Sequence, residues 1–212
     1  DVHSHHLKKL FGWLDEISVK DVSLQLRMMG KTFELIKDQN RSIENEEERQ
    51  NHFSSVCQKY SSEVGRMYHI LNSVESDYEK DVIKSNLHAS AWLWMGDGFI
   101  SSDHIAYSSS INAQPYLFTV PPDLACFRNL LSTFNIRQTF GSSDYCMVLS
   151  RMAKDFQEKK TENSARTIEL AVSLVQKISD DVFRLTGFDI YAPTQNGNLE
   201  QVGNMVYDDA PW

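Results

Sequence analysis

The stretch Ser101-Ser102-Asp103-His104 has the side-chain types of a hydrolytic triad. In a triad the serine attacks the substrate, the histidine takes its proton and the carboxylate orients the histidine, so each group must point at the next. Adjacent residues rarely meet that demand, and no G-x-S-x-G elbow accompanies them. We interpret the stretch as a polar turn and predict no catalytic role for it.

Metal binding is suggested by the N-terminal histidines His3, His5 and His6. His3 and His6 would share one face of a helix, but a structural zinc site needs three or four ligands with supporting neighbours. No matching Cys or His pair follows at ligand spacing. We interpret these histidines as solvent-facing residues and predict no bound metal.

Gly96-Asp97-Gly98 is the stretch closest to a phosphate-binding loop. It has neither the Walker spacing nor the G-x-G-x-x-G spacing, and no acidic residues stand two and four positions after Asp97, as a calcium loop requires. The carboxylate of Asp97 would also repel phosphate. We predict a tight turn in which both glycines need a positive φ, and no nucleotide or other cofactor.

Two features could serve a protein partner. Trp92 and Trp94 would share one face of a strand and could form an aromatic platform, but large aromatic side chains are more often core anchors, and we favour the core. Glu44 and the run 46–48 could form an acidic docking patch. We favour a solvated helix start, because carboxylates suit the positive end of the helix dipole.

The chain contains three cysteines, Cys57, Cys126 and Cys146, all in apolar sequence contexts. Burial raises the pKa of a thiol and lowers its reactivity, so none is a good nucleophile. The count is odd and no pair has C-x-x-C spacing. We predict free thiols, a reducing compartment and, with the points above, a protein that is not an enzyme.

Composition narrows the class of protein further. The 212 residues carry a net charge of −8, whereas binding to a nucleic acid backbone needs a basic stripe. No apolar run approaches the ~18 residues of a membrane span, and no signal peptide precedes the fold. We expect a cytoplasmic protein that binds neither nucleic acid nor membrane. The first residue is Asp1 rather than Met, so we expect a piece of a larger protein.

Helical periodicity dominates residues 1–90. Apolar residues recur every three or four positions in the segments 7–17, 22–36 and 53–71, as in amphipathic helices. Gly30 lies within the second pattern, where we interpret it as a tolerated interior glycine. If residues 45–74 form one helix, it is about 45 Å long, a scaffold-like length. We predict a helical subdomain over residues 1–90.

The period changes after residue 90. Short apolar runs at 91–100, 104–107 and 116–120 predict strands separated by turns. Pro121-Pro122-Asp123 predicts the start of a helix that continues to Phe134. Two more helices are expected, one capped by Ser142 or Ser143 and one running from Ser164 to Gly187. Asn196-Gly197 predicts a hairpin within 190–207.

The resulting prediction is an α+β fold, mainly helical, with short antiparallel strands in the centre and a C-terminal β-hairpin. Residues 91–212 would form an α+β subdomain packed on the helical subdomain 1–90, or the two would form one continuous domain.

Several short motifs in residues 90–212 together resemble the large repeats of the sacsin family. These motifs are Trp92, Gly96-Asp97-Gly98-Phe99, Pro115-Tyr116-Leu117, Val120-Pro121-Pro122-Asp123-Leu124, Phe127-Arg128, Asp144-Tyr145 with Val148-Leu149, and Val206-Tyr207-Asp208-Asp209-Ala210-Pro211-Trp212. The chain departs from the family at Asp208, where Asn is frequent, and at Asn135-Ile136-Arg137, where a Gly-Val-Arg-like run is frequent. Which repeat it resembles therefore stays open.

The resemblance implies a segment of a very large cytoplasmic co-chaperone. Each repeat of that family opens with an ATPase-like module marked by a Glu…Asn helix box and Asp-x-Gly-x-Gly, and neither motif is present here. The J-domain motif His-Pro-Asp is absent as well. The resemblance thus implies a part of a repeat that follows the ATPase-like module, with no nucleotide-site residue to carry over.

These observations lead to a functional expectation with two alternatives. We expect a non-enzymatic scaffold or interaction segment of a co-chaperone in protein quality control. Its partners would be other domains of the parent chain and, through that chain, client proteins and the seventy-kilodalton heat-shock chaperone machinery. The alternatives are a hydrolase whose site is unrecognised and a passive structural spacer.

Overall fold

The computed structural model describes residues 18–159, 165–179, 187–195 and 197–205. The chain forms two compact units, Asp1–Ile105 with Val120–Ile136, and Ala106–Thr119 with Arg137–Trp212. The expected boundary at residue 90 does not coincide with this division. The first unit retains residues 91–105 because their aromatic side chains pack into its helices.

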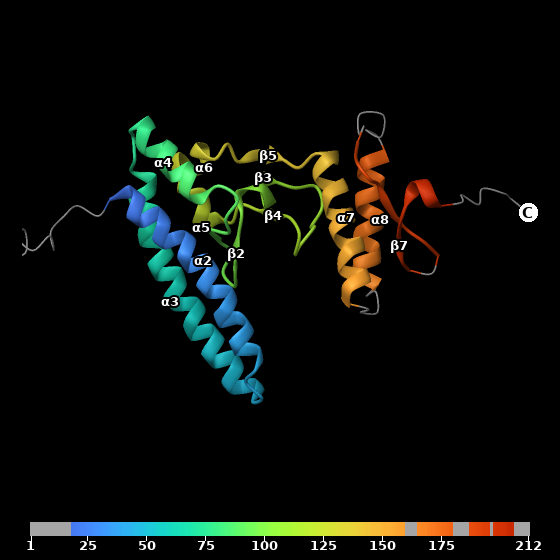
Figure 1. Ribbon diagram of the computed structural model, residues 1–212, viewed down its shortest axis with the longest axis horizontal. Coiled ribbons are helices and arrows are strands. Elements are labelled where there is room, and N and C mark those ends of the chain that lie inside the picture. The colour runs from blue at the N-terminus through green and yellow to red at the C-terminus, as the bar shows by residue number, and fades with distance from the viewer. Residues whose placement is uncertain (1–17, 160–164, 180–186, 196, 206–212) are drawn as a thin grey trace, which may run out of the picture. The chain divides into compact units, whose positions relative to one another are not determined.

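The first unit is built on three helices, α2 (Val19–Arg41), α3 (Glu46–Asn72) and α4 (Asp77–Leu87). Each begins at a polar side chain that accepts a hydrogen bond from the backbone amide three residues on: Ser18, Asn45 and Ser76. Such caps satisfy amides that have no partner inside the helix. Helix α2 packs against both α3 and α4, and the long α2 and α3 run side by side (Figure 1). The helices predicted within 22–36 and 45–74 are confirmed.

Gly30 corrects one expectation. A Cβ atom at this position would lie 2.0 Å from the carbonyl oxygen of Ala91. Because atoms cannot approach so closely, only glycine lets the backbone at Ala91 lie against α2. Gly30 is therefore required by packing and is not merely tolerated.

The rest of the first unit closes over these helices. Strands β1 (Leu93–Trp94) and β2 (Phe99–Ile100) pair antiparallel, and the 3₁₀ helix η1 (Ser102–His104) follows them. The helix expected from Pro122 to Phe134 is two helices, α5 (Pro122–Ala125) and α6 (Arg128–Thr133). The break falls at Phe127, whose φ of −87° and ψ of 55° are not helical.

The second unit combines short strands with two amphipathic helices. Strand β3 (Ile105–Ser108) lies between β4 (Phe118–Thr119) and β5 (Arg137–Thr139). Helix α7 (Ser142–Lys159) packs against α8 (Ala165–Ser179), and both contact β6 (Tyr191–Pro193). Strand β6 pairs with β7 (Leu199–Gln201), and the 3₁₀ helix η3 (Val202–Asn204) follows.

The predicted α+β, mainly helical class is confirmed. The strand pairs β1–β2 and β6–β7 are antiparallel, as predicted for the centre and the C-terminal hairpin. The pair β3–β5 is parallel, which the sequence did not indicate.

Gly197 has a φ of 76° at the hairpin turn. Asn196, His3, His5, His6 and the segment 206–212 lie outside the described residues.

Candidate functional site

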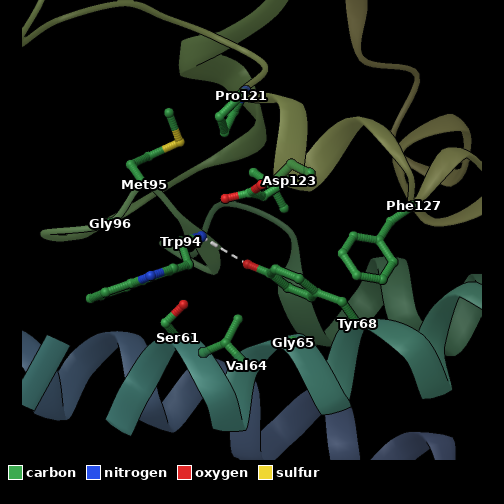
Figure 2. Close-up of a pocket in the computed structure, with 11 residues that line it drawn as sticks. Ser61, Val64, Gly65, Tyr68, Trp94, Met95, Gly96, Pro121, Asp123 and Phe127 are labelled. Atoms are coloured by element: carbon green, nitrogen blue, oxygen red, sulfur yellow. Dashed lines mark hydrogen bonds between the residues drawn. The ribbon is translucent and has the colours of Figure 1, made fainter. Parts of the chain in front are cut away.

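A groove of about 320 Å³ opens on the first unit. One wall is α3, and the other comes from the residues after β1 and from the start of α5 (Figure 2). The lining residues are Ser61, Val64, Gly65, Tyr68, Trp94, Met95, Gly96, Pro121, Asp123, Leu124 and Phe127. Most of these side chains are apolar, and the groove is neither a sealed cavity nor a flat surface.

The α3 wall follows from helical spacing. Val64, Gly65 and Tyr68 follow Ser61 by three, four and seven positions, so the four residues share one face of the helix. Val64 and Tyr68 are buried, whereas Gly65 is only partly covered. Adding a Cβ atom to Gly65 would meet no heavy atom within 4 Å. At Gly65, the α3 wall of the groove therefore consists of bare helix backbone.

Tyr68 fixes the opposite wall to α3. Its hydroxyl donates a hydrogen bond to the carbonyl oxygen of Trp92 at 2.7 Å. It also accepts one from the amide of Trp94 at 2.8 Å, which Figure 2 shows. Burial raises the pKa of Tyr68 well above its ordinary value, because the phenolate would lose its hydration, and the amide of Trp94 only partly offsets this. Tyr68 is thus a neutral structural group with no capacity for acid–base chemistry near neutral pH.

The aromatic residues Trp94 and Tyr68 of the groove lining pack against other aromatic rings. The ring of Trp94 lies edge-on to Phe33 with centroids 4.9 Å apart and stacks on Tyr60 at 6.1 Å. Tyr68 lies edge-on to Phe127 at 5.4 Å. Edge-to-face packing of this kind gives aromatic pairs a fixed geometry. The apolar wall of the groove is therefore held in place before any ligand arrives.

Asp123 is the one charged residue in the groove lining. Its side chain is exposed, and Figure 2 shows its carboxyl oxygen turned towards the space beside Trp94. Among the described residues, no hydrogen bond or ion pair engages this carboxylate. The groove therefore combines a mostly apolar lining with one negative charge that has no partner among the described residues.

The groove lining holds no nucleophile paired with a base. Its hydroxyls belong to Ser61 and Tyr68, and neither histidine nor cysteine lines it. Acyl or phosphoryl transfer needs a nucleophile, a base and donors converging on one point. The arrangement suits the binding of an apolar group and does not provide that convergence.

The sequence candidates for a triad lie elsewhere in the first unit. The hydroxyl of Ser101 and Nδ1 of His104 are 2.9 Å apart, brought together by the single turn of η1. Asp103 is exposed in that turn, and none of these residues lines the groove. Ser101 and His104 are therefore in contact, as neighbours in a polar turn.

The turn after β1 partly matches its prediction. Gly96 has a φ of 99°, a conformation that favours glycine, whereas Gly98 is not in the positive-φ region. The expectation for Gly98 was wrong, and its backbone instead lies near the amine of Lys37, which donates to the carbonyl of Asp97 at 3.4 Å. The turn places Gly96 in the groove lining.

The two tryptophans are buried, as predicted. Trp92 is inaccessible to solvent and Trp94 is 8% exposed. Glu46, Glu47 and Glu48 occupy the first turn of α3, where a helix start was expected.

The cysteines match their prediction only in part. Cys146 is buried and Cys57 half-buried, and burial raises the pKa of both thiols. Cys126 is exposed, which corrects the expectation of an apolar setting, because the end of α5 lies at the surface.

The described residues contain neither a candidate metal cluster nor a candidate membrane-spanning helix. No group of three or more His, Cys, Asp or Glu side chains there has the arrangement of a metal site. No helix in that part of the chain is long and apolar enough to cross a membrane.

The groove itself was missed by sequence reasoning. Its residues come from three stretches, 61–68, 94–96 and 121–127, that are distant along the chain. One signal was present: Gly65 is a glycine in the interior of the helix predicted within 45–74, where glycine weakens a helix relative to alanine. Without the partner segments this glycine has no interpretation.

Comparison with known proteins gives one match. The chain is 25% identical to human sacsin over 146 residues, which cover 63% of this chain and 3% of sacsin. The chain is sacsin-like in sequence. No protein-family model and no solved structure matches it. The likeness supports a relationship with sacsin, and because the chain spans only about 3% of the length of sacsin, it identifies no particular segment.

Proposed function

We propose that this chain is a non-enzymatic protein-interaction segment of a sacsin-like, chaperone-related protein. The observation that supports this most directly is the groove, an apolar and partly open surface whose lining carries no nucleophile–base pair. Apolar grooves with few polar groups are typical of sites that bind rather than transform a ligand.

The sequence similarity gives the proposal its context. On this proposal the segment works in the cytoplasm as part of a co-chaperone in protein quality control. It corresponds to a part of one repeat that follows the ATPase-like module. Its partners are other domains of the parent chain and client proteins, with the seventy-kilodalton heat-shock machinery reached through that chain.

Binding to peptides tests this proposal. The labelled 212-residue chain is applied to an immobilised array of short peptides scanned from several unfolded model proteins, with serum albumin as the control. The proposal expects a reproducible subset of peptides to bind above the control. If no peptide binds, the chain is better described as a passive spacer, and the interaction role is contradicted.

The contact between Ser101 and His104 keeps a hydrolase as the second candidate. A serine hydroxyl 2.9 Å from an imidazole nitrogen is a geometry that nucleophilic catalysis uses. Ester hydrolysis by the purified chain and by Ser101→Ala separates this candidate from the interaction role.

A further inference from the structure

The two glycines inside the long helices of the first unit stand in opposite situations. At Gly30 in α2, the space that a Cβ atom would need is occupied, since the carbonyl oxygen of Ala91 lies 2.0 Å from that position. Gly65 in α3 faces open space, since a Cβ atom there would meet nothing within 4 Å. Packing among the described residues therefore explains Gly30 and gives no reason for Gly65.

An unexplained glycine in a helix has a cost. Glycine loses more conformational freedom on folding than alanine does, so it weakens the helix that contains it. A glycine is favoured despite this cost where another group must come close to the backbone. No described residue has a heavy atom within 4 Å of a Cβ placed at Gly65, and the residue lines the groove, so a bound ligand has room to make that approach.

Asp123 indicates that a ligand whose group lies against Gly65 also carries a positive charge nearby. Its carboxylate faces the groove (Figure 2) and has no ion-pair partner among the described residues. It lies in the first turn of α5, but that helix has only 4 residues and so provides little dipole to stabilise the charge. A cation on the ligand, next to the group that lies against Gly65, would neutralise the charge of Asp123.

The edge of β1 excludes one mode of peptide binding. The carbonyl of Trp92 and the amide of Trp94 are both engaged by the hydroxyl of Tyr68. A peptide therefore cannot use these groups to add a strand to β1, which is how exposed sheet edges bind peptides. This favours a ligand that enters the groove by its side chains.

From these observations we propose that the groove binds a polypeptide segment through one bulky apolar side chain and an adjacent lysine or arginine. The apolar side chain lies over the backbone of Gly65, between Val64 and Met95, and the cation pairs with Asp123. Met95 is half-buried, and its flexible thioether adapts to apolar groups of different shape. The inference rests on the proposed interaction function and specifies its site and its ligand.

Nuclear magnetic resonance titration of the ¹⁵N-labelled 212-residue chain tests the proposal. The probe is acetyl-Ser-Gly-Leu-Lys-Gly-Ser-amide, compared with the same peptide carrying Glu in place of Lys or Ala in place of Leu. We expect the amide signals of Gly65 and Gly96 to shift, and both altered peptides to bind at least fivefold more weakly. The preference for Lys should shrink at high salt, because the ion pair is exposed.

Variants of the chain provide the decisive comparison. Gly65→Leu fills the groove from the α3 side and should weaken the Leu-Lys peptide at least tenfold while the melting temperature holds or rises. Asp123→Asn should abolish the preference for Lys over Glu. The matched controls are Gly203→Ala, another position with open space around an added Cβ, and Asp103→Asn, another exposed aspartate of the same unit, and neither should change binding.

The outcomes separate the site from the function. If Gly65→Leu folds and still binds the peptide as tightly as the unaltered chain, the proposed site is wrong. If Gly65→Leu fails to fold, Gly65→Ala decides in the same way, because alanine favours the helix. If the array peptides bind but shift signals away from the groove, the interaction function stands and this inference fails. If no peptide binds at all, both fail.

Discussion

The amide of Trp94 donates a hydrogen bond to the hydroxyl of Tyr68, 26 residues earlier in the chain, across 2.8 Å of buried space. The same hydroxyl donates to the carbonyl of Trp92. One side chain of α3 thus satisfies two backbone groups of the segment that leads into β1. Buried backbone groups without partners are costly, so this side chain is what allows β1 to lie against the helix.

Replacing Tyr68 by phenylalanine removes that hydroxyl and leaves both backbone groups unpaired. Because each unsatisfied buried group costs about 1–3 kcal/mol and two are left, we expect Tyr68→Phe to lower the free energy of unfolding by about 2–6 kcal/mol. Urea denaturation followed by tryptophan fluorescence measures this. Tyr78→Phe is the control, since Tyr78 is 78% exposed and the change there should cost less than about 0.5 kcal/mol. Equal effects of the two changes would contradict the role assigned to Tyr68.

The contrast between Gly30 and Gly65 gives a second prediction. Gly30→Ala forces a Cβ atom against the Ala91 carbonyl, and overpacking of this kind costs about 1–3 kcal/mol or more. Gly65→Ala adds its methyl group to open space and should stabilise α3 by up to about 1 kcal/mol. Thermal unfolding of the two variants should therefore move in opposite directions. A stabilising effect of Gly30→Ala would show that the backbone at Ala91 can move away.

Local patterns in the sequence were sufficient for the helices and the main core positions. Val22, Leu26, Met29 and Phe33 are buried, as their spacing indicates, because an amphipathic helix must bury its apolar face. Trp92 also followed from residue type alone, since a large aromatic side chain gains most from burial.

The groove and the close approach at Gly30 could not be predicted in this way. Both depend on which segments meet in space, and neither spacing nor composition states that Ala91 lies on α2 or that the 121–127 segment faces α3. The parallel pairing of β3 with β5 was hidden for the same reason, because register between distant strands leaves no local pattern. The exposed Cys126 shows the converse, since apolar neighbours in sequence did not bury it.

Asp144 in the second unit gives a third prediction. Its buried carboxylate accepts a hydrogen bond from the amide of Gly141 at 2.9 Å and pairs with Arg137. Asp144→Asn removes the charge, and since a charged hydrogen bond contributes about 1.5–3 kcal/mol, we expect a loss of that order. Asp38→Asn is the control, because its pair with Arg41 is exposed and worth less than about 1 kcal/mol. Chemical denaturation of both variants checks the difference.

Tyr116 gives a prediction about pH. Burial, the hydrogen bond to Asp155 at 2.9 Å and the charge of Asp155 raise the pKa of Tyr116 to about 12, against a nearby Arg151 that lowers it. Since the ordinary pKa is 10.0, the unfolded chain loses this proton first. The contribution of Tyr116 to stability is thus complete below pH 10 and is lost as the pH rises towards 12.

Denaturation of the chain and of Tyr116→Phe at increasing alkaline pH measures this contribution. The difference in free energy of unfolding between the two proteins should shrink as the pH rises from 10 to 12. A difference that stays constant would place the phenol in an ordinary, solvated setting. Ultraviolet absorbance of the phenolate gives an independent reading of the same titration.

The last prediction concerns the contact between Ser101 and His104. Ser101 directly precedes η1 and His104 is its last residue, so the backbone of a single turn brings the two together without any other element aiming them at a substrate. A working triad takes its parts from separate elements because the nucleophile must face a bound acyl group and an oxyanion hole at once. We therefore expect Ser101→Ala to hydrolyse p-nitrophenyl acetate at the same rate as the unaltered chain, within twofold. In a hydrolase that uses this serine, the substitution would remove most of the activity, since loss of the nucleophile disables the whole triad. A fall of tenfold or more, with the fold intact by circular dichroism, would assign catalysis to the turn and contradict the non-enzymatic function.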